Sequence, residues 1–256
     1  AGMAVTIRLA AGELHAFEIP FFRNLFGLFF ALFLLRRNTG LRALKTNRLG
    51  LYFLRCLIGL GAMLTGFWSL IHLPLGQAIA LSYATPLFVT IGAVLVLGEV
   101  VRMRRWSAVI IGFIGVLVIV RPWTTTMSPA VLIAVLSSAL AASAAITIKF
   151  LSRSEPAEAI VIWMVLIMTP LSLLPALPYW AWPSAPVWGW LVLTGFLGTA
   201  GHMLLTEAYK RGDVSALTPI NFVQLPVVAV LAWWLFDEGI SRYTVIGASI
   251  IFASTI

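Results

Sequence analysis

The stretch LTPINFVQLPVVAVLAWWLFDE, residues 217–238, is almost wholly apolar and long enough to cross a membrane. It nevertheless contains two prolines, Pro219 and Pro226, and two side-chain amides, Asn221 and Gln224. Proline removes a backbone hydrogen bond and kinks a helix, and polar groups freed in lipid need partners or a water-filled cavity. This stretch therefore predicts a bent membrane helix beside a polar site.

The composition indicates that the whole chain, like this stretch, belongs in a membrane. Hydrophobic residues make up 61% and charged residues 10% of the 256 residues, whereas a water-soluble domain has about 25% charged residues. We therefore classify the chain as an all-α polytopic membrane protein. Its single cysteine, Cys56, cannot form an intramolecular disulfide and is expected to be a packing residue. We expect neither a cofactor nor a metal.

Ten apolar segments predict ten transmembrane helices joined by short loops, which leave no room for a soluble domain. The first is expected to be a truncated helix. The segments are 1–12, 17–35, 49–73, 77–98, 107–120, 128–148, 157–177, 187–209, 214–236 and 241–256.

Positive charges are distributed unequally between the two ends of these helices. Thirteen gather at one end, namely Arg36, Arg37, Arg42, Lys45, Arg48, Arg55, Arg102, Arg104, Arg105, Lys149, Arg153, Lys210 and Arg211. Four remain at the other end: Arg8, Arg23, Arg121 and Arg242. The positive-inside rule places the first group and both termini in the cytoplasm, with the chain in the cell inner membrane. The net charge of +8 then reflects anionic lipid, and no nucleic acid is needed as a partner.

Two long segments repeat one order of features, GQAIALSYATPLFVTIGAVLVLGEVVRMRRWSAVIIG (76–112) and GDVSALTPINFVQLPVVAVLAWWLFDEGISRYTVIG (212–247). Each has Ala-Leu, a helix broken by proline, an acidic residue at the end of that helix and an Ile-Gly pair in the next helix. The predicted repeats, 1–122 and 128–256, contain five helices each, and an odd number inverts the second copy in the bilayer. Inverted repeats are typical of secondary transporters. The alternative is that apolar helices resemble each other through composition alone.

These segments also resemble a known family. FFRNLFGLFFALFLLRR (21–37), YATPLFVTIGAVLVLGE (83–99) and the 217–238 stretch are similar to the drug/metabolite transporter superfamily with two EamA repeats. The resemblance covers the whole chain, and within the superfamily the amino-acid exporters, including the aromatic amino-acid subgroup, look most similar. It implies an exporter with its cavity among helices one to four and six to nine, and with the fifth and tenth helices outside.

Polar side chains form one stripe on each of four predicted helices, and converging stripes would line a wet cavity for a neutral or zwitterionic solute. The alternative for each residue is a hydrogen bond that holds the bundle together. Trp163 is added because it lies too deep for the outer aromatic belt. The predicted substrate-binding residues are Trp68, His72, Tyr83, Trp163, His202, Thr206, Asn221 and Gln224, and the predicted helix kinks are Pro86, Pro219 and Pro226.

Other polar and small residues have a structural interpretation. Glu18 and Arg23 lie near the outer end of their helix and could pair with each other or with Arg8. Glycines spaced by three, Gly195, Gly198 and Gly201, predict close helix packing, as does SSALAASAA (137–145).

The sequence thus predicts a secondary transporter that exports neutral or aromatic amino acids by alternating access. The alternative is an exporter of another small metabolite or drug, such as a nucleotide derivative, a vitamin or a quaternary amine. An enzyme is not expected, since His15, His72 and His202 have no catalytic or metal-binding partners at suitable spacing. The expected partners are the solute and membrane lipid. The coupling ion and the oligomeric state stay open, and a monomer is compatible.

Overall fold

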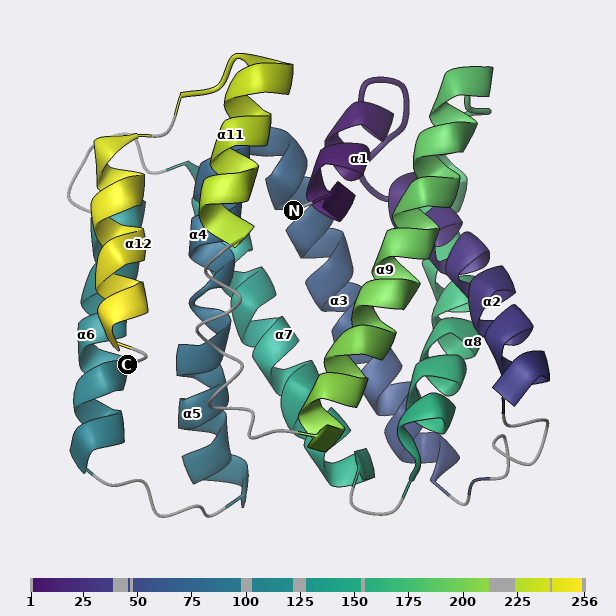
Figure 1. Ribbon diagram of the computed structural model, residues 1–256, viewed down its shortest axis with the longest axis horizontal. Coiled ribbons are helices and arrows are strands. Elements are labelled where there is room, and N and C mark those ends of the chain that lie inside the picture. Colours follow the sequence, from purple (N-terminus) through teal and green to yellow (C-terminus); the bar gives the residue numbers. More distant parts are fainter. Residues whose placement is uncertain are drawn as a thin grey trace.

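The computed structural model is a bundle of helices (Figure 1). It describes residues 2–38, 46, 48–97, 103–121, 128–152, 155–211, 224–239 and 241–254. The first half contains α1 (Gly2–Ala10), α2 (Glu18–Asn38), α3 (Leu49–His72), α4 (Leu75–Ser82), α5 (Thr85–Leu97) and α6 (Met103–Val120). The second half contains α7 (Pro129–Ser152), α8 (Ala157–Ala176), the 3-10 turn η2 (Leu177–Tyr179), α9 (Ala185–Arg211), α11 (Gln224–Phe236) and α12 (Arg242–Ser254).

Helices dominate because hydrocarbon offers backbone groups no partner, and a helix satisfies them internally. Among the described residues, five spans are long and apolar enough to cross a membrane: Leu49–His72, Leu75–Val96, Pro129–Leu151, Ala159–Tyr179 and Ala185–Leu204. Large apolar side chains point outward from the bundle, as Phe29, Leu95 and Trp234 do at 62%, 78% and 72% exposure. Such a surface suits lipid.

The two halves contact each other through matching helices (Figure 1). Helix α2 packs on α8 and α6 on α12, and each pair joins elements at the same place in the two halves. Helix α4 packs on α11, which belongs to the corresponding predicted membrane span of the second half. Contacts between unlike helices also come in pairs, since α1 packs on α9 as α7 packs on α3. The same holds for α2 on α9 and α8 on α3. This pattern is what two copies of one unit related by a two-fold axis would produce.

The fourth predicted helix is divided into α4 and α5. Pro86 has no N–H to donate, and the chain makes tight turns at Tyr83 and Ala84, whose N–H groups bond the carbonyls of Ala80 and Leu81 at 3.2 and 3.0 Å. Ser138 of α7 donates a second bond to the Leu81 carbonyl at 3.0 Å. A neighbouring helix therefore satisfies a carbonyl at the break, as a membrane interior requires.

Small residues bring helices together at two further places. Ser137 of α7 donates to the carbonyl of Ala62 in α3 at 2.9 Å, so the predicted packing face 137–145 is confirmed at this contact. In the α6–α12 pair, a Cβ on Gly115 would lie 2.7 Å from the carbonyl oxygen of Gly247. Only glycine allows that approach. The pair lies at one side of the bundle and α2 with α8 at the other (Figure 1).

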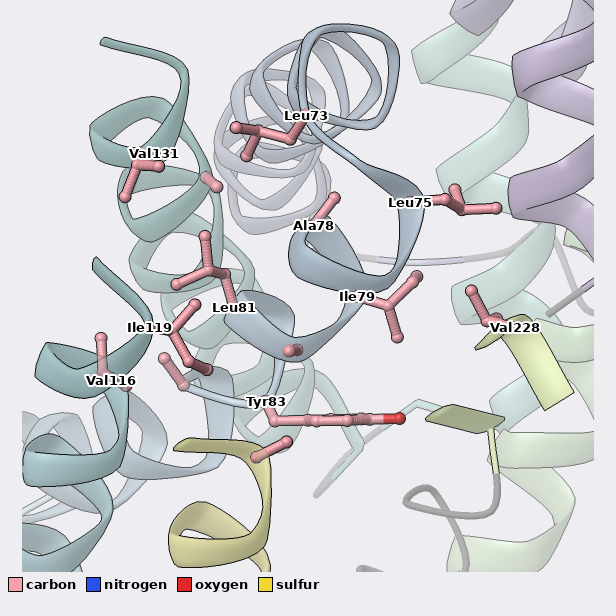
Figure 2. Packing of buried hydrophobic residues seen from close by; sticks show 14 of the residues in the cluster. Leu73, Leu75, Ala78, Ile79, Leu81, Tyr83, Val116, Ile119, Val131 and Val228 are labelled. Carbon is pink, nitrogen blue, oxygen red and sulfur yellow. The ribbon is translucent and has the colours of Figure 1, made fainter. Parts of the chain in front are cut away.

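A main apolar cluster surrounds the α4–α5 junction (Figure 2). It contains Leu75, Leu81 and Tyr83 from this junction, and Val116 and Val228 from α6 and α11. Dispersion contacts rather than exclusion of water hold such a cluster in lipid, so its fit depends on close packing. The cluster therefore joins helices of both halves around the α4–α5 break.

Candidate substrate site

The α2–α9 interface is built on glycines. A Cβ on Gly195 would lie 2.5 Å from Cβ of Phe26, and a Cβ on Gly27 would lie 2.6 Å from Oγ1 of Thr199. Such distances are too short for any larger residue, so the predicted packing role of Gly195 is confirmed. Gly201 meets nothing within 4 Å and takes no part in this contact.

Arg23 of α2 is buried in this interface at 4% exposure. Its Nε and Nη2 lie 2.7 and 2.9 Å from the place a Cβ of Gly198 would occupy, and its Cζ lies farther away at 3.2 Å, so this edge of the guanidinium faces Gly198 of α9. Its Nη1 donates to Oδ1 of Asn24 at 2.7 Å, and the Asn24 amide donates to Ser172 of α8 at 3.2 Å. The Arg23 Nε has no acceptor among the described residues.

Arg55 of α3 is buried to the same degree, 4% exposed, against α8. Its Nη1 lies 3.7 Å from the sulfur of Met168, and its Nε also has no acceptor in the described part of the chain. Gly59, one turn further along α3, leaves room for this side chain, since a Cβ there would lie 3.2 Å from Nη1. Arg55 thus lies inside the bundle, within two turns of the start of α3, and the side of the membrane it belongs to stays a prediction.

The two arginines lie in neighbouring parts of one region. Asn24, which accepts from Arg23, bonds Ser172, and Arg55 contacts Met168, one turn away along α8. His202 follows Gly198, the residue that Arg23 faces, by one turn of α9. The ion pair found among the described side chains joins Arg8 to Glu238, and neither Arg23 nor Arg55 has a carboxylate partner there. A charged residue at the bilayer centre costs about 2.5–3.5 kcal/mol on insertion scales, so two such residues mark a functional region.

The position of this region follows from the pairing of the halves. Arg23 lies where α2 meets α9, and Arg55 lies where α3 meets α8. These two interfaces are counterparts, and the α2–α8 contact lies between them. Transporters built from two repeats place their substrate sites at the repeat interface. We therefore take the region around Arg23, Arg55 and His202 as the candidate site.

Glu18 does not take the partners suggested by the sequence. It is fully buried, and its carboxylate accepts the N–H groups of His15 at 3.0 Å and Ala181 at 2.6 Å. Carboxylates are favourable at a helix N-terminus, and Glu18 is the first residue of α2. The expected pairing of Glu18 with Arg23 or Arg8 is thus replaced by backbone bonds that hold α2 to the segment before α9.

The predicted site residues lie in several places. Trp68 stacks on His72 at the end of α3, with ring centroids 3.9 Å apart, and His72 is exposed. Tyr83 is buried at 6% exposure in the α4–α5 cluster (Figure 2). Trp68 packs against the same cluster. His202 lies beside the arginines. Trp163 packs against Tyr52 in a separate cluster, and its Nε1 is buried with no acceptor among the described residues.

The remaining predicted positions are only partly described. Thr206 lies on α9 and Gln224 begins α11, with Pro226 as its third residue, but their side chains fall outside the described ones. Pro219 and Asn221 lie in 212–223, outside the described residues. Their role in a solute path stays a prediction.

The family follows from comparison with known proteins. The profile of the EamA-like transporter family matches this chain twice, over residues 1–121 and 128–256. The chain belongs to the EamA-like transporter family. It is therefore a multi-pass secondary transporter of small molecules in the drug/metabolite transporter superfamily, and not an enzyme.

Several EamA relatives have assigned substrates. The riboflavin transporter of Vibrio cholerae is 33% identical over 85% of this chain and 74% of its own length. The S-adenosylmethionine uptake transporter of Rickettsia prowazekii is 31% identical over 95% of this chain and 83% of its own. The pseudopaline exporter of Pseudomonas aeruginosa is 26% identical over 99% and 89%.

A solved crystal structure has the same EamA fold. It superposes with a TM-score of 0.71 and covers 99% of this chain and 92% of its own, at 20% sequence identity. At that identity the likeness concerns the fold alone.

The sequence contained a signal for both arginines that our site prediction did not use. Arg23 and Arg55 interrupt apolar runs, FFRNLF (21–26) and YFLRCLIG (52–59). Ionisable residues inside a span are functional candidates by default. Each lies within two turns of a predicted helix end, where an outer ion pair for Arg23 and a contribution to the positive-inside bias for Arg55 are the simpler interpretations.

Proposed function

We propose that this EamA protein transports a metabolite with an aromatic heterocycle, a vitamin or a nucleoside derivative, by alternating access. The observation that carries the proposal is the set of relatives above 30% identity, which are two riboflavin transporters and an S-adenosylmethionine uptake transporter. Both solutes join a planar ring system to a polar chain. The alternative substrate class predicted from the sequence, which included vitamins and nucleotide derivatives, is thus favoured over amino acids.

Aromatic side chains of the described helices suit such a ring. Trp163 has a buried Nε1 with no acceptor among the described residues, and this N–H could donate to a ring carbonyl or ring nitrogen of the solute. The Trp68–His72 stack presents a second flat surface, and its half-buried indole packs against the α4–α5 cluster. Offset stacking on such faces stabilises planar rings beyond the apolar area they bury.

Amino-acid export is the second candidate. The overall resemblance to amino-acid exporters and the neutral polar stripes of the sequence favour it. It ranks lower because the relatives with substantial identity carry larger solutes. Their functions include uptake as well as export, so the export direction stays a prediction.

The architecture supports alternating access. Matching helices of the two halves pack on each other, and motion of one half against the other would expose a central site to each side in turn. Arg8 and Glu238 join the halves at the end predicted to face outward. Opening toward that side requires this contact to break.

Reconstitution in liposomes tests the substrate class. Purified protein is expected to exchange internal unlabelled riboflavin or S-adenosylmethionine for the labelled compound, and liposomes without protein set the background. Labelled phenylalanine, leucine and threonine are measured in the same preparation. Counterflow of an amino acid with none of either heterocyclic compound would reverse the ranking of the two candidates.

A further inference from the structure

Arg23 and Arg55 hold two positive charges where α2, α3, α8 and α9 pack together. Both side chains are 4% exposed. A buried guanidinium is costly unless hydrogen bonds and an opposite charge compensate it. The described hydrogen bonds of these two guanidinium groups go to a neutral amide oxygen and a thioether sulfur. Neither acceptor carries a charge, so the described side chains of this region carry excess positive charge.

A purely structural role does not explain the arrangement. An arginine that only joins helices would bond backbone carbonyls with its donors, as Arg8 does with the carbonyls of Leu70 and Leu73. The Nε atoms of Arg23 and Arg55 are instead buried without an acceptor among the described residues. Nε and a terminal nitrogen form the fork that binds two oxygens of a carboxylate or phosphate. The Nε–Nη2 edge of Arg23 faces Gly198, so an anion would engage Arg23 through its two terminal nitrogens and Arg55 through Nε and a terminal nitrogen.

We propose that Arg23 and Arg55 bind an anionic group of the transported solute, a carboxylate or a phosphate, at the interface of the two halves. The inference rests on the proposed transport function and adds a substrate feature to it. His202 lies one turn along α9 from Gly198, the residue that Arg23 faces.

The apolar surroundings would make the site selective for an anionic group. Apolar residues of α3 and α8, among them Leu60, Val165 and Met168, form a buried cluster next to Arg55. Electrostatic contacts are stronger in such a low-dielectric region than in water. A neutral analogue of the solute would leave both guanidinium groups without a charged partner. Sites built in this way reject the analogue that lacks the polar group far more strongly than sites that recognise apolar shape.

Matched pairs of probes test the proposal on the full chain in nanodiscs of neutral lipid, where no lipid anion competes. The pairs are S-adenosylmethionine with its decarboxylated form, riboflavin 5′-phosphate with riboflavin, and phenylalanine with phenylalaninamide. Binding is measured by calorimetry. In at least one pair, the member that carries the carboxylate or phosphate should bind at least about tenfold more tightly than the member that lacks it. The pair that responds distinguishes carboxylate from phosphate, and equal affinities within all three pairs would overturn the proposal.

Variants locate the effect. Arg23→Gln and Arg55→Gln should each reduce the preference at least about fivefold, chiefly by weakening the anionic probe. Arg242→Gln removes an exposed arginine from the start of α12 and should leave the preference unchanged. If a Gln variant does not fold, Arg23→Lys and Arg55→Lys retain the charge but lose the fork, and should still reduce the preference. If folded Gln or Lys variants at Arg23 and at Arg55 both keep the wild-type preference for the carboxylate- or phosphate-bearing probe, the assignment is refuted.

The outcomes separate this inference from the proposed substrate class. Transport of riboflavin with no anion preference in any pair would leave the substrate class standing and remove the anion site. Binding of phenylalanine over its amide, dependent on both arginines and without binding of either heterocyclic compound, would support the anion site and reject the substrate class.

Discussion

Arg8 of α1 forms an ion pair with Glu238, which follows α11. The same guanidinium donates to the carbonyls of Leu70 and Leu73 at the end of α3, and Glu238 accepts the N–H of Leu75 at 2.7 Å. Four elements from both halves thus meet at one pair of charges. This end is predicted to face outward, so the described conformation is closed at that side.

Removing the Glu238 charge should favour opening at this end. Both side chains are about one-fifth exposed, 19% for Arg8 and 21% for Glu238, so we expect a shift of only ~1 kcal/mol, or about fivefold in population. Ala232 lines the same small cavity as Glu238 and is 1% exposed. In an Ala232→Cys, Cys56→Ser protein, Glu238→Gln should raise the rate of labelling by an impermeant thiol reagent about fivefold.

Asp237→Asn is the matched control. Asp237 is the neighbouring carboxylate, is exposed, and has a φ of 52°, which asparagine tolerates well. It should leave the labelling rate unchanged. Equal rates for the Glu238→Gln and control proteins would show that the ion pair does not hold this end closed.

This ion pair also shows what the sequence could not predict. Arg8 and Glu238 are 230 residues apart, and no local pattern links them. The sequence offered Glu18 as a nearer partner for Arg8. Glu18 instead satisfies backbone N–H groups at the start of α2 and before α9. Partner choice between distant charges depends on the helix arrangement, which hydropathy leaves open.

Local features were more predictable than the site. The break before Pro86 follows from a missing N–H, and the contact at Gly195 follows from small-residue spacing. The polar stripes assumed that uncharged donors line the cavity. The described residues instead bring together Arg23, Arg55 and His202, of which only the histidine was predicted. Helical spacing identifies a face, but it does not say which neighbour that face meets.

The topology prediction concerns the loops 36–48, 99–106, 149–156 and 210–213, which we expect in the cytoplasm. The charge bias that motivates it survives without Arg55, since the other charges of that group remain. Single cysteines at 38–46 in a Cys56→Ser background should resist an impermeant thiol reagent added to intact cells and react after lysis. Labelling from outside before lysis would contradict the assignment.

Gly198→Ala should disturb the candidate site. Its new Cβ would lie 2.7 Å from Nε of Arg23, so the guanidinium must move away from α9. We expect transport per folded molecule to fall at least about tenfold if Arg23 is displaced from its productive position. Gly201→Ala, one turn along the same helix, meets nothing within 4 Å and should retain transport. Equal transport by the two alanine variants would mean that the position of Arg23 is unimportant.

The α6–α12 pair should determine stability rather than transport. A Cβ on Gly115 would lie 2.7 Å from both the Gly247 carbonyl oxygen and Cγ1 of Ile251. Overpacking of this kind costs about 1–3 kcal/mol, so Gly115→Ala should lower the unfolding temperature in detergent. Gly189→Ala, which meets nothing within 4 Å, is the control. An unchanged unfolding temperature for Gly115→Ala would show that the two helices separate readily.

The last prediction returns to the amides of the 217–238 stretch. A solute with charged and polar groups needs donors and acceptors, and an amide supplies both. Losing one hydrogen bond to a charged group costs about 1.5–3 kcal/mol, roughly tenfold to over a hundredfold in affinity. Asn221→Ala and Gln224→Ala should therefore raise the apparent transport constant of the best-transported solute, with expression and monodispersity unchanged.

Val227→Ala provides the comparison within the same helix. Val227 is 44% exposed on α11, so its truncation removes an outward-facing side chain and should change transport little. If an amide only holds the bundle together, its substitution should lower the unfolding temperature and leave the transport constant unchanged. Measuring both quantities for each variant therefore separates solute contacts from hydrogen bonds between helices, and wild-type kinetics in both amide variants would remove these residues from the solute path.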